Sequence, residues 1–233
     1  MISRTILLPI LCAMVVSACS EKAKPTETSF WPWFKSQKSE LADLFSYETG
    51  AAGQNNPDLH KKMEDTVAEV GGKLRKVHPE FSPFFGYSDD TNTLTITVNG
   101  QAEHFAAVDD FVAAAPEVEG WKFIALKQPL SLGADTEIQS GTAKLKVVDW
   151  RYTKTKNSNG AFNFVIYVPN KVSDDAEGFK SLFSQLTRDF LGERFASTAV
   201  GEITVRQLPD SAPEGLLPFI DIHDDVSQAI NKG

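Results

Sequence analysis

The chain has 233 residues, of which 42% are hydrophobic and 23% charged, so it can bury a core without the help of a metal or a disulfide. The formal net charge of -8 argues against nucleic acid as a partner, because phosphate binding requires clustered Lys and Arg. We therefore expect a globular protein without a nucleic-acid partner.

The N-terminal segment is typical of an export signal. Residues 1–18 contain an early arginine, an apolar stretch and small residues immediately before Cys19. The sequence Val16-Ser17-Ala18-Cys19 resembles the lipobox of bacterial lipoproteins. The resemblance implies cleavage before Cys19, a diacylglycerol thioether on its sulfur and a further acyl chain, such as palmitate, on its new amino group. Several acyl chains would hold the protein firmly on a membrane.

The residue after the lipobox cysteine indicates in which membrane a lipoprotein is anchored. In the Gram-negative sorting pattern an Asp at this position retains a lipoprotein in the inner membrane, whereas Ser20 stands here. The resemblance therefore implies the outer membrane, with the protein facing the periplasm. Cys12 leaves with the signal and Cys19 takes the lipid, so no thiol remains for a disulfide, a nucleophile or a zinc site. An ordinary signal peptide would instead leave Cys19 as a free thiol.

Residues 19–29 are polar and without periodicity, which predicts a lipidated tether, and a single α+β domain follows over 30–233. The domain opens with helices over 30–78. Trp31 belongs to an apolar stripe of the first helix, and with Trp33 it either packs inside the fold or forms an interaction surface. Asn56 is expected to cap the second helix.

A strand, a helix and a strand are predicted between residues 93 and 126. Leu94, Ile96 and Val98 alternate with three threonines, which predicts a strand with its apolar face on the core and its threonine face toward solvent. Helical spacing follows until Pro116, and the short apolar run 121–126 predicts a buried strand. A further strand is expected over 81–87.

The second half repeats this order. Strands are predicted over 144–152, with a bulge where the alternation changes phase, and over 162–168. A strongly amphipathic helix follows, which Gly192 ends or bends, and the last strand covers 199–208.

These elements predict an α+β fold with two ββαβ units, a ferredoxin-like element order, over 81–127 and 143–208. One mostly antiparallel sheet with helices on one face would bury every apolar stripe, although the sequence leaves open whether both units share one sheet. A tail and a short helix are expected over 209–233.

Three short motifs in the mature chain resemble an uncharacterised bacterial family. They are a Phe-Trp-x-Trp-Phe opening at 30–34, His78-Pro79 before a strand, and Ala-Ala-Ala-Pro at 113–116 followed by Trp121. The resemblance covers most of the mature chain but implies no activity and no catalytic residue.

Common catalytic signatures are absent from the sequence, including nucleophile elbows, phosphate loops, dinucleotide fingerprints and zinc-binding helices. His78 is a weak candidate for a general base, because it also suits the end of a helix. Asp221, His223 and Asp225 are weak metal-ligand candidates, since the same residues favour a helix N-terminus. No cofactor is expected.

Two functions remain open at this level. The first is a lipid-anchored envelope protein that acts as an interaction or binding module, with an envelope protein as partner. The alternative is a periplasmic hydrolase or metal-dependent enzyme using His78, or using His223 with the neighbouring aspartates. The lack of a catalytic signature favours the binding module.

Overall fold

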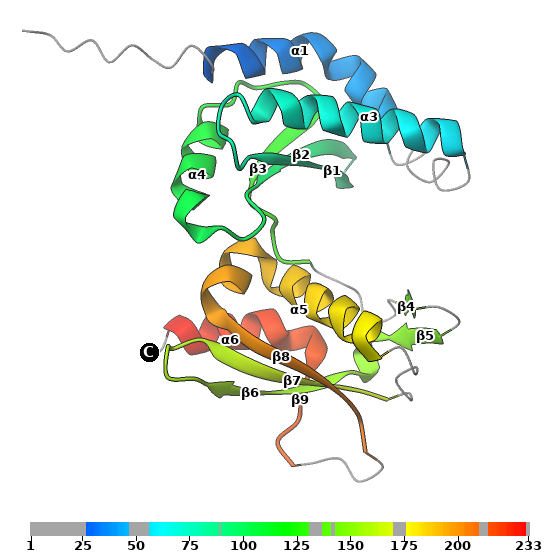
Figure 1. Ribbon diagram of the computed structural model, residues 1–233, viewed down its shortest axis with the longest axis vertical. Coiled ribbons are helices and arrows are strands. Elements are labelled where there is room, and N and C mark those ends of the chain that lie inside the picture. Colours follow the sequence, from blue (N-terminus) through cyan, green and yellow to red (C-terminus); the bar gives the residue numbers. More distant parts are fainter. Residues whose placement is uncertain are drawn as a thin grey trace, which may run out of the picture.

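The computed structural model describes residues 27–46, 56–88, 90–130, 137–140, 143–169, 176–209 and 214–231. These residues form two units, each with its own apolar core (Figure 1). The α+β fold class predicted from the sequence is confirmed, including its two N-terminal helices. The lipobox and most of the predicted tether lie outside the described residues.

The first unit combines three helices with a three-stranded sheet. In chain order its elements are α1 (Glu27–Leu44), α3 (Pro57–Leu74), β1 (Ser82–Ser88), β2 (Thr91–Thr97), the short 3-10 helix η1 (Ala102–His104), α4 (Phe105–Ala113) and β3 (Trp121–Ala125). As predicted, the side chain of Asn56 caps α3 by accepting a hydrogen bond from the backbone N–H of Leu59.

The second unit contains a small hairpin, a four-stranded sheet and two helices. Its elements are β4 (Glu137–Ser140), β5 (Ala143–Lys146), η2 (Val147–Asp149), β6 (Arg151–Lys156), β7 (Phe162–Val168), α5 (Ala176–Ala199), β8 (Val200–Gln207), β9 (Leu217–Pro218), η3 (Phe219–Asp221) and α6 (Ile222–Asn231). The strands β4 and β5 pair only with each other.

Both units contain the β-β-α-β order expected from the sequence, but the strands do not join into one sheet. The first sheet has the order β1-β2-β3 and the second β8-β7-β6-β9. In each, the central strand is antiparallel to the strand before it and parallel to the strand after the helix. The single, mostly antiparallel sheet was therefore wrong, because each unit buries its apolar residues in a core of its own.

The strand predicted over 144–152 was also wrong. The change of phase that suggested a bulge is a turn of 3-10 helix, η2, which separates β5 from β6. Val147 and Trp150, at its two ends, are fully buried. The apolar residues of this stretch therefore face the core from a turn rather than from a continuous strand.

The predicted boundary between tether and domain lies too late. Helix α1 begins at Glu27, three residues before the expected start, so Pro32 is inside the helix and not in its first turn. The apolar stripe was predicted correctly, because Phe34 and Leu41 are buried in the first core. The interior proline is tolerated in a helix that this core holds in place.

The threonine face of β2 was expected to face solvent and does not. Leu94, Ile96 and Val98 pack into the helix-covered core, as predicted. The opposite face is buried as well, and Thr93, Thr95 and Thr97 are only 7%, 5% and 2% exposed. Thr97 is covered by Glu193 of α5, which accepts a hydrogen bond from the Thr97 hydroxyl, and Thr95 lies between Phe84 and Ile124 of the neighbouring strands.

The arrangement of layers places α5 in the middle of the molecule. In Figure 1, α1 and α3 lie above the first sheet, while α5 lies between the second sheet and the first unit. The buried side chains of β7, including Phe164 and Ile166, face the α5 and α6 side of the second sheet. Helix α5 is thus the element through which the two units meet.

Candidate functional site

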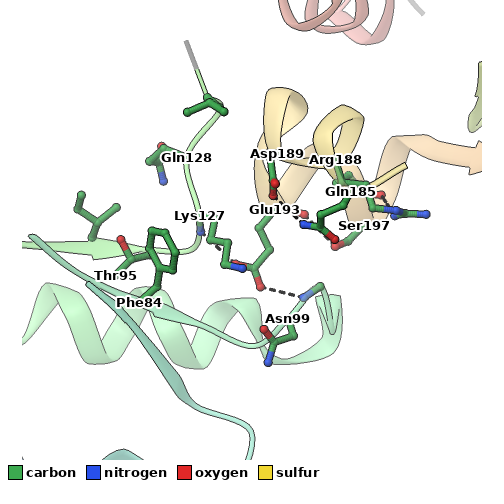
Figure 2. A pocket seen from close by; sticks show the side chains of 14 residues that line it. Phe84, Thr95, Asn99, Lys127, Gln128, Gln185, Arg188, Asp189, Glu193 and Ser197 are labelled. Carbon is green, nitrogen blue, oxygen red and sulfur yellow. Dashed lines mark hydrogen bonds between the residues drawn. The ribbon is translucent and has the colours of Figure 1, made fainter. Parts of the chain in front are cut away.

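A cleft of about 430 Å³ lies between the two units (Figure 2). This volume falls within the range of sites that hold small molecules in proteins. The first sheet contributes Phe84, Thr95 and Ile124 to its lining. Residues 127–130, which follow β3 and form the described part of the connecting segment between the units, contribute Lys127, Gln128 and Leu130. Helix α5 contributes Gln185, Arg188 and Asp189. The cleft therefore exists only when both units are in place.

The floor of the cleft is a row of three paired residues across the first sheet. Phe84 of β1 is opposite Thr95 of β2, and Thr95 is opposite Ile124 of β3. The Phe84 ring is 53% exposed, whereas Thr95 between its neighbours is nearly covered. An aromatic ring of this size left open to solvent is an apolar surface that a ligand can cover.

A kink in α5 brings the second unit to the connecting segment. Gly192 has φ 75° and ψ 159°, which interrupts the helix, as one of the two outcomes expected from the sequence. A Cβ atom at this position would lie 2.7 Å from the Pro129 nitrogen. Only glycine satisfies both the positive φ and the close approach of the Pro129 backbone.

The residue after the kink, Glu193, joins the two units. Its buried carboxylate accepts hydrogen bonds from the Thr97 hydroxyl at 2.7 Å and from the Gly100 N–H at 2.8 Å. The N–H groups of Val98 and Lys127 also donate to it, at 3.1 and 3.0 Å. Four donors thus compensate the charge that burial removes from water.

Three further contacts support this junction. The backbone N–H of Glu193 donates to the Lys127 carbonyl at 2.8 Å, and the N–H of Leu130 donates to the Asp189 carbonyl at 2.8 Å. Arg194 forms an ion pair with Asp109 of α4 at 2.8 Å. Backbone hydrogen bonds therefore hold the connecting segment against α5 at Lys127 and at Leu130.

Most polar groups around the cleft already have partners within the protein. The amide nitrogen of Gln128 donates to the Ala125 and Leu126 carbonyls, and that of Gln185 donates to the Asp189 carboxylate. The Ser197 hydroxyl donates to the Glu193 carbonyl. These groups shape the cleft and offer few donors to a ligand.

The side chains of Lys127 and Asn99, which line the cleft, have no hydrogen-bond or ion-pair partner among the described residues. In the part of the chain that the structure describes, the Lys127 ammonium group has no carboxylate within ion-pair distance, and it lies 5.4 Å from the centroid of the Phe84 ring. Arg188 donates to the Ala196 carbonyl, and Figure 2 shows its side chain extending away from Lys127. The amide of Asn99, at the edge of the cleft, is exposed and also without a partner among the described residues.

The tryptophans predicted as an interaction surface are largely part of the first core. Trp31 is 7% exposed and stacks on Phe111 at 4.7 Å, so a partner cannot reach its ring. Trp33 is half-buried, and the Lys73 ammonium lies 4.9 Å from its ring centroid. Of the two alternatives left open by the sequence, packing inside the fold therefore describes Trp31.

His78 lies in the first unit and is not among the described residues that line the cleft. Its ring stacks on Phe81 at 4.8 Å, has the His104 ring 4.7 Å away and accepts a hydrogen bond from the Glu80 N–H through Nδ1. All four histidines are described, and none forms a hydrogen bond with a serine, threonine or tyrosine hydroxyl of the described residues. The arrangement groups no nucleophile with a base.

The weak metal candidates are separated by their partners. Asp225 accepts hydrogen bonds from the Tyr152 hydroxyl and from the Lys154 ammonium, which fix α6 on β6. His223 instead contacts Asp224 at 3.2 Å and the edge of the Phe195 ring. Within the described residues, no three His, Cys, Asp or Glu side chains are arranged to hold a metal ion.

The partners of Asp225 also change its acid-base behaviour. Burial raises the pKa of Asp225, but the hydrogen bonds from Lys154 and Tyr152 and the charge of Lys154 outweigh burial and hold this pKa below its ordinary value. Burial, followed by the hydrogen bond to Asp225, raises the pKa of Tyr152. The aspartate therefore stays ionised and acts as a structural anion.

Cys19, the predicted lipidation site, lies outside the described residues. Among the helices that are described, none combines the length and apolarity needed to cross a bilayer. The lipid on Cys19 therefore stays a prediction from the lipobox.

Sequence reasoning missed the residues that form the cleft. Glu193 and Lys127 have no motif, and Phe84 belongs to a short strand with no special pattern. The one usable signal was Gly192 inside a strongly amphipathic helix, because a glycine there often marks a bend with a close packing partner.

Comparison with known proteins provides no further assignment. No family model matches the chain, and no significant match was found among the curated proteins or the solved structures.

Proposed function

We propose that the protein is a lipid-anchored envelope protein of bacteria, facing the periplasm from the outer membrane, and that it acts as a binding module. Its binding site is the cleft between the two units. The observation that carries the proposal is a cleft of about 430 Å³ lined by the exposed Phe84 ring and by the Lys127 ammonium, which contacts this ring and has no carboxylate within ion-pair distance among the described residues.

Two features of the cleft support binding rather than chemistry. Its buried carboxylate, Glu193, is fully occupied by donors of the protein, so it is not free to accept a proton from a substrate. The described residues that line the cleft include no histidine and no cysteine. What remains available, Lys127, Asn99 and the Phe84 face, can position a ligand through charge, hydrogen bonds and apolar contact.

The lipid anchor is tested by measuring whether Cys19 is lipidated. Cells supplied with labelled palmitate should incorporate the label into the wild-type protein, and the Cys19→Ser variant should carry none, because it lacks the sulfur that directs lipidation. Label that persists in the variant, or that is absent from both, would contradict the lipid anchor.

The binding site is tested in intact cells with a photo-crosslinking amino acid. Leu130 lines the cleft and is exposed, whereas Ala68 is exposed on α3 of the first unit and serves as the control position. One discrete envelope molecule, identified by mass spectrometry, should be captured in every repeat from position 130 and not from position 68. Equal capture from both positions, or only random neighbours, would reject the cleft as the binding site.

A further inference from the structure

We infer that the cleft binds a small amphipathic monoanion, with its carboxylate at Lys127 and its flat apolar part on the Phe84 ring. The inference rests on the proposed function, since it names the ligand class of the same site. It follows from the lining groups that form no hydrogen bond or ion pair with other described residues and are therefore available to a ligand.

The first step concerns charge. Glu193 has four donors and Asp189 accepts a hydrogen bond from Gln185, whereas the Lys127 ammonium has no carboxylate within ion-pair distance among the described residues. Figure 2 shows Arg188 extending away from Lys127, so Lys127 is the cation nearest to the Phe84 ring among the described lining residues. An ammonium group in a partly enclosed cleft favours a ligand that supplies an anion when no described carboxylate lies within ion-pair distance of it. The exposed Asn99 amide adds a neutral donor at the same end of the cleft.

The second step concerns shape. Phe84 and Ile124 flank the nearly covered Thr95 on the floor, and Leu130 forms an apolar patch on the connecting segment. The Lys127 ammonium lies 5.4 Å from the Phe84 ring centroid, so the charged and the aromatic parts of the site are adjacent. A ligand that joins a flat apolar group directly to an anion matches this pair of neighbours.

The third step concerns the number of charges. Among the described lining residues, four are ionisable, Lys127, Arg188, Asp189 and Glu193, and their two positive and two negative charges sum to zero. A single negative charge can be accommodated by Lys127, whereas a dianion would add uncompensated charge beside two carboxylates. This favours a carboxylate over a phosphate.

The inference is tested with the lipidated full chain in nanodiscs of zwitterionic lipid, by titration calorimetry against empty nanodiscs. The probes are phenylpropionate, its neutral amide and inorganic phosphate. Phenylpropionate should bind, and the amide should bind about tenfold more weakly because it lacks the charge that pairs with Lys127. Phosphate should bind more weakly still, because it lacks the apolar group.

Two variants and a matched control locate the binding. Lys127→Met keeps the backbone contacts of residue 127 to Glu193 and should weaken phenylpropionate binding about tenfold while leaving binding of the amide unchanged. Phe84→Ala should weaken the binding of both. Lys122→Met removes an exposed lysine of β3 that does not line the cleft, and it should change neither.

Equal binding of phenylpropionate and its amide, or unchanged phenylpropionate binding by Lys127→Met, would overturn the inference. If no probe binds but position 130 captures an envelope molecule in cells, the ligand class is wrong and the proposed function stands. If position 130 captures nothing specific, yet phenylpropionate binding depends on Lys127, the ligand class stands and the proposed partner falls.

Discussion

The two β-β-α-β units differ most in the helix that follows their central strand. In the first unit α4 has 9 residues, whereas α5 of the second unit has 24. The additional length includes the kink at Gly192 and the carboxylate of Glu193, which bonds to the first unit. The extended helix therefore serves its own core and also the neighbouring unit.

This difference explains why the two sheets are covered differently. The first sheet has helices on one face and the second unit on part of the other, so residues on both faces of β2 are buried. In β7 of the second sheet, burial alternates along the strand, as expected when one face packs on helices and the other does not. The same element order therefore occurs in two environments. The first sheet, next to the junction at Glu193, has buried residues on both faces of its central strand, whereas burial in β7 of the second sheet alternates.

The largest effect is expected from Glu193→Ala, which removes the junction. Four buried or partly buried donors would lose their acceptor, and we expect a loss of about 4 kcal/mol in the free energy of unfolding. Calorimetry should show one transition for the wild type and two for the variant, one for each unit. Glu117→Ala, which removes an exposed carboxylate, is the control. A single transition within about 0.5 kcal/mol of the wild type would reject the junction.

A second pair of substitutions compares the two cores directly. Ile96 on β2 and Ile166 on β7 occupy central strands and are fully buried, so each Ile→Ala change should cost about 3 kcal/mol. In the Glu193→Ala background, calorimetry should show Ile96→Ala lowering only the transition of the first unit and Ile166→Ala only that of the second. If either change lowered both transitions equally, the two units would not be separate cores.

The kink can be tested with two glycines of similar conformation. Gly192 and Gly120 have φ 75° and 77°, but a Cβ would approach the Pro129 backbone only at Gly192, since nothing lies within 4 Å of Gly120. Chemical denaturation should show a loss of about 2.5 kcal/mol for Gly192→Ala and about 1 kcal/mol for Gly120→Ala. Equal losses would mean that the contact with Pro129 has no energetic role.

The smallest effect concerns Asp225, which acts within the second unit alone. Its folded-state pKa is lowered, so its contribution is fully present above its ordinary pKa of 3.8 and is lost as the pH falls through the folded-state pKa. Asp225→Asn should cost about 1 kcal/mol at neutral pH, a figure reduced for the partial exposure of the ion pair. Denaturation at neutral pH and at about pH 3 should show this difference shrinking.

Asp224→Asn is the matched control for that measurement, because its side chain is 82% exposed. A difference between wild type and Asp225→Asn that stays constant with pH would contradict the ionic role. In the Glu193→Ala variant, the change at Asp225 should lower only the second unit's transition, which ties this test to the comparison of the two units.

Local patterns predicted much of each unit. The cap at Asn56, the apolar face of β2 and the alternation of β7 follow from hydrogen bonding and side-chain periodicity, which depend on neighbouring residues in the sequence. The separate sheets, the burial of Thr97 and the role of Glu193 depend on how one unit meets the other. Such contacts leave no periodic signal, since the partners are far apart in the chain.

The separation in sequence between Glu193 and its partners has a consequence for the order of folding. Its bonds to Thr97, Gly100 and Lys127 join positions 96, 93 and 66 residues apart, whereas the hairpins β1-β2 and β6-β7 are local. Closing long loops costs more entropy, so the junction should form after both units. The carboxylate of Glu193 would then slow the opening of the finished molecule while leaving the rate of folding almost unchanged, and so set the lifetime of the cleft.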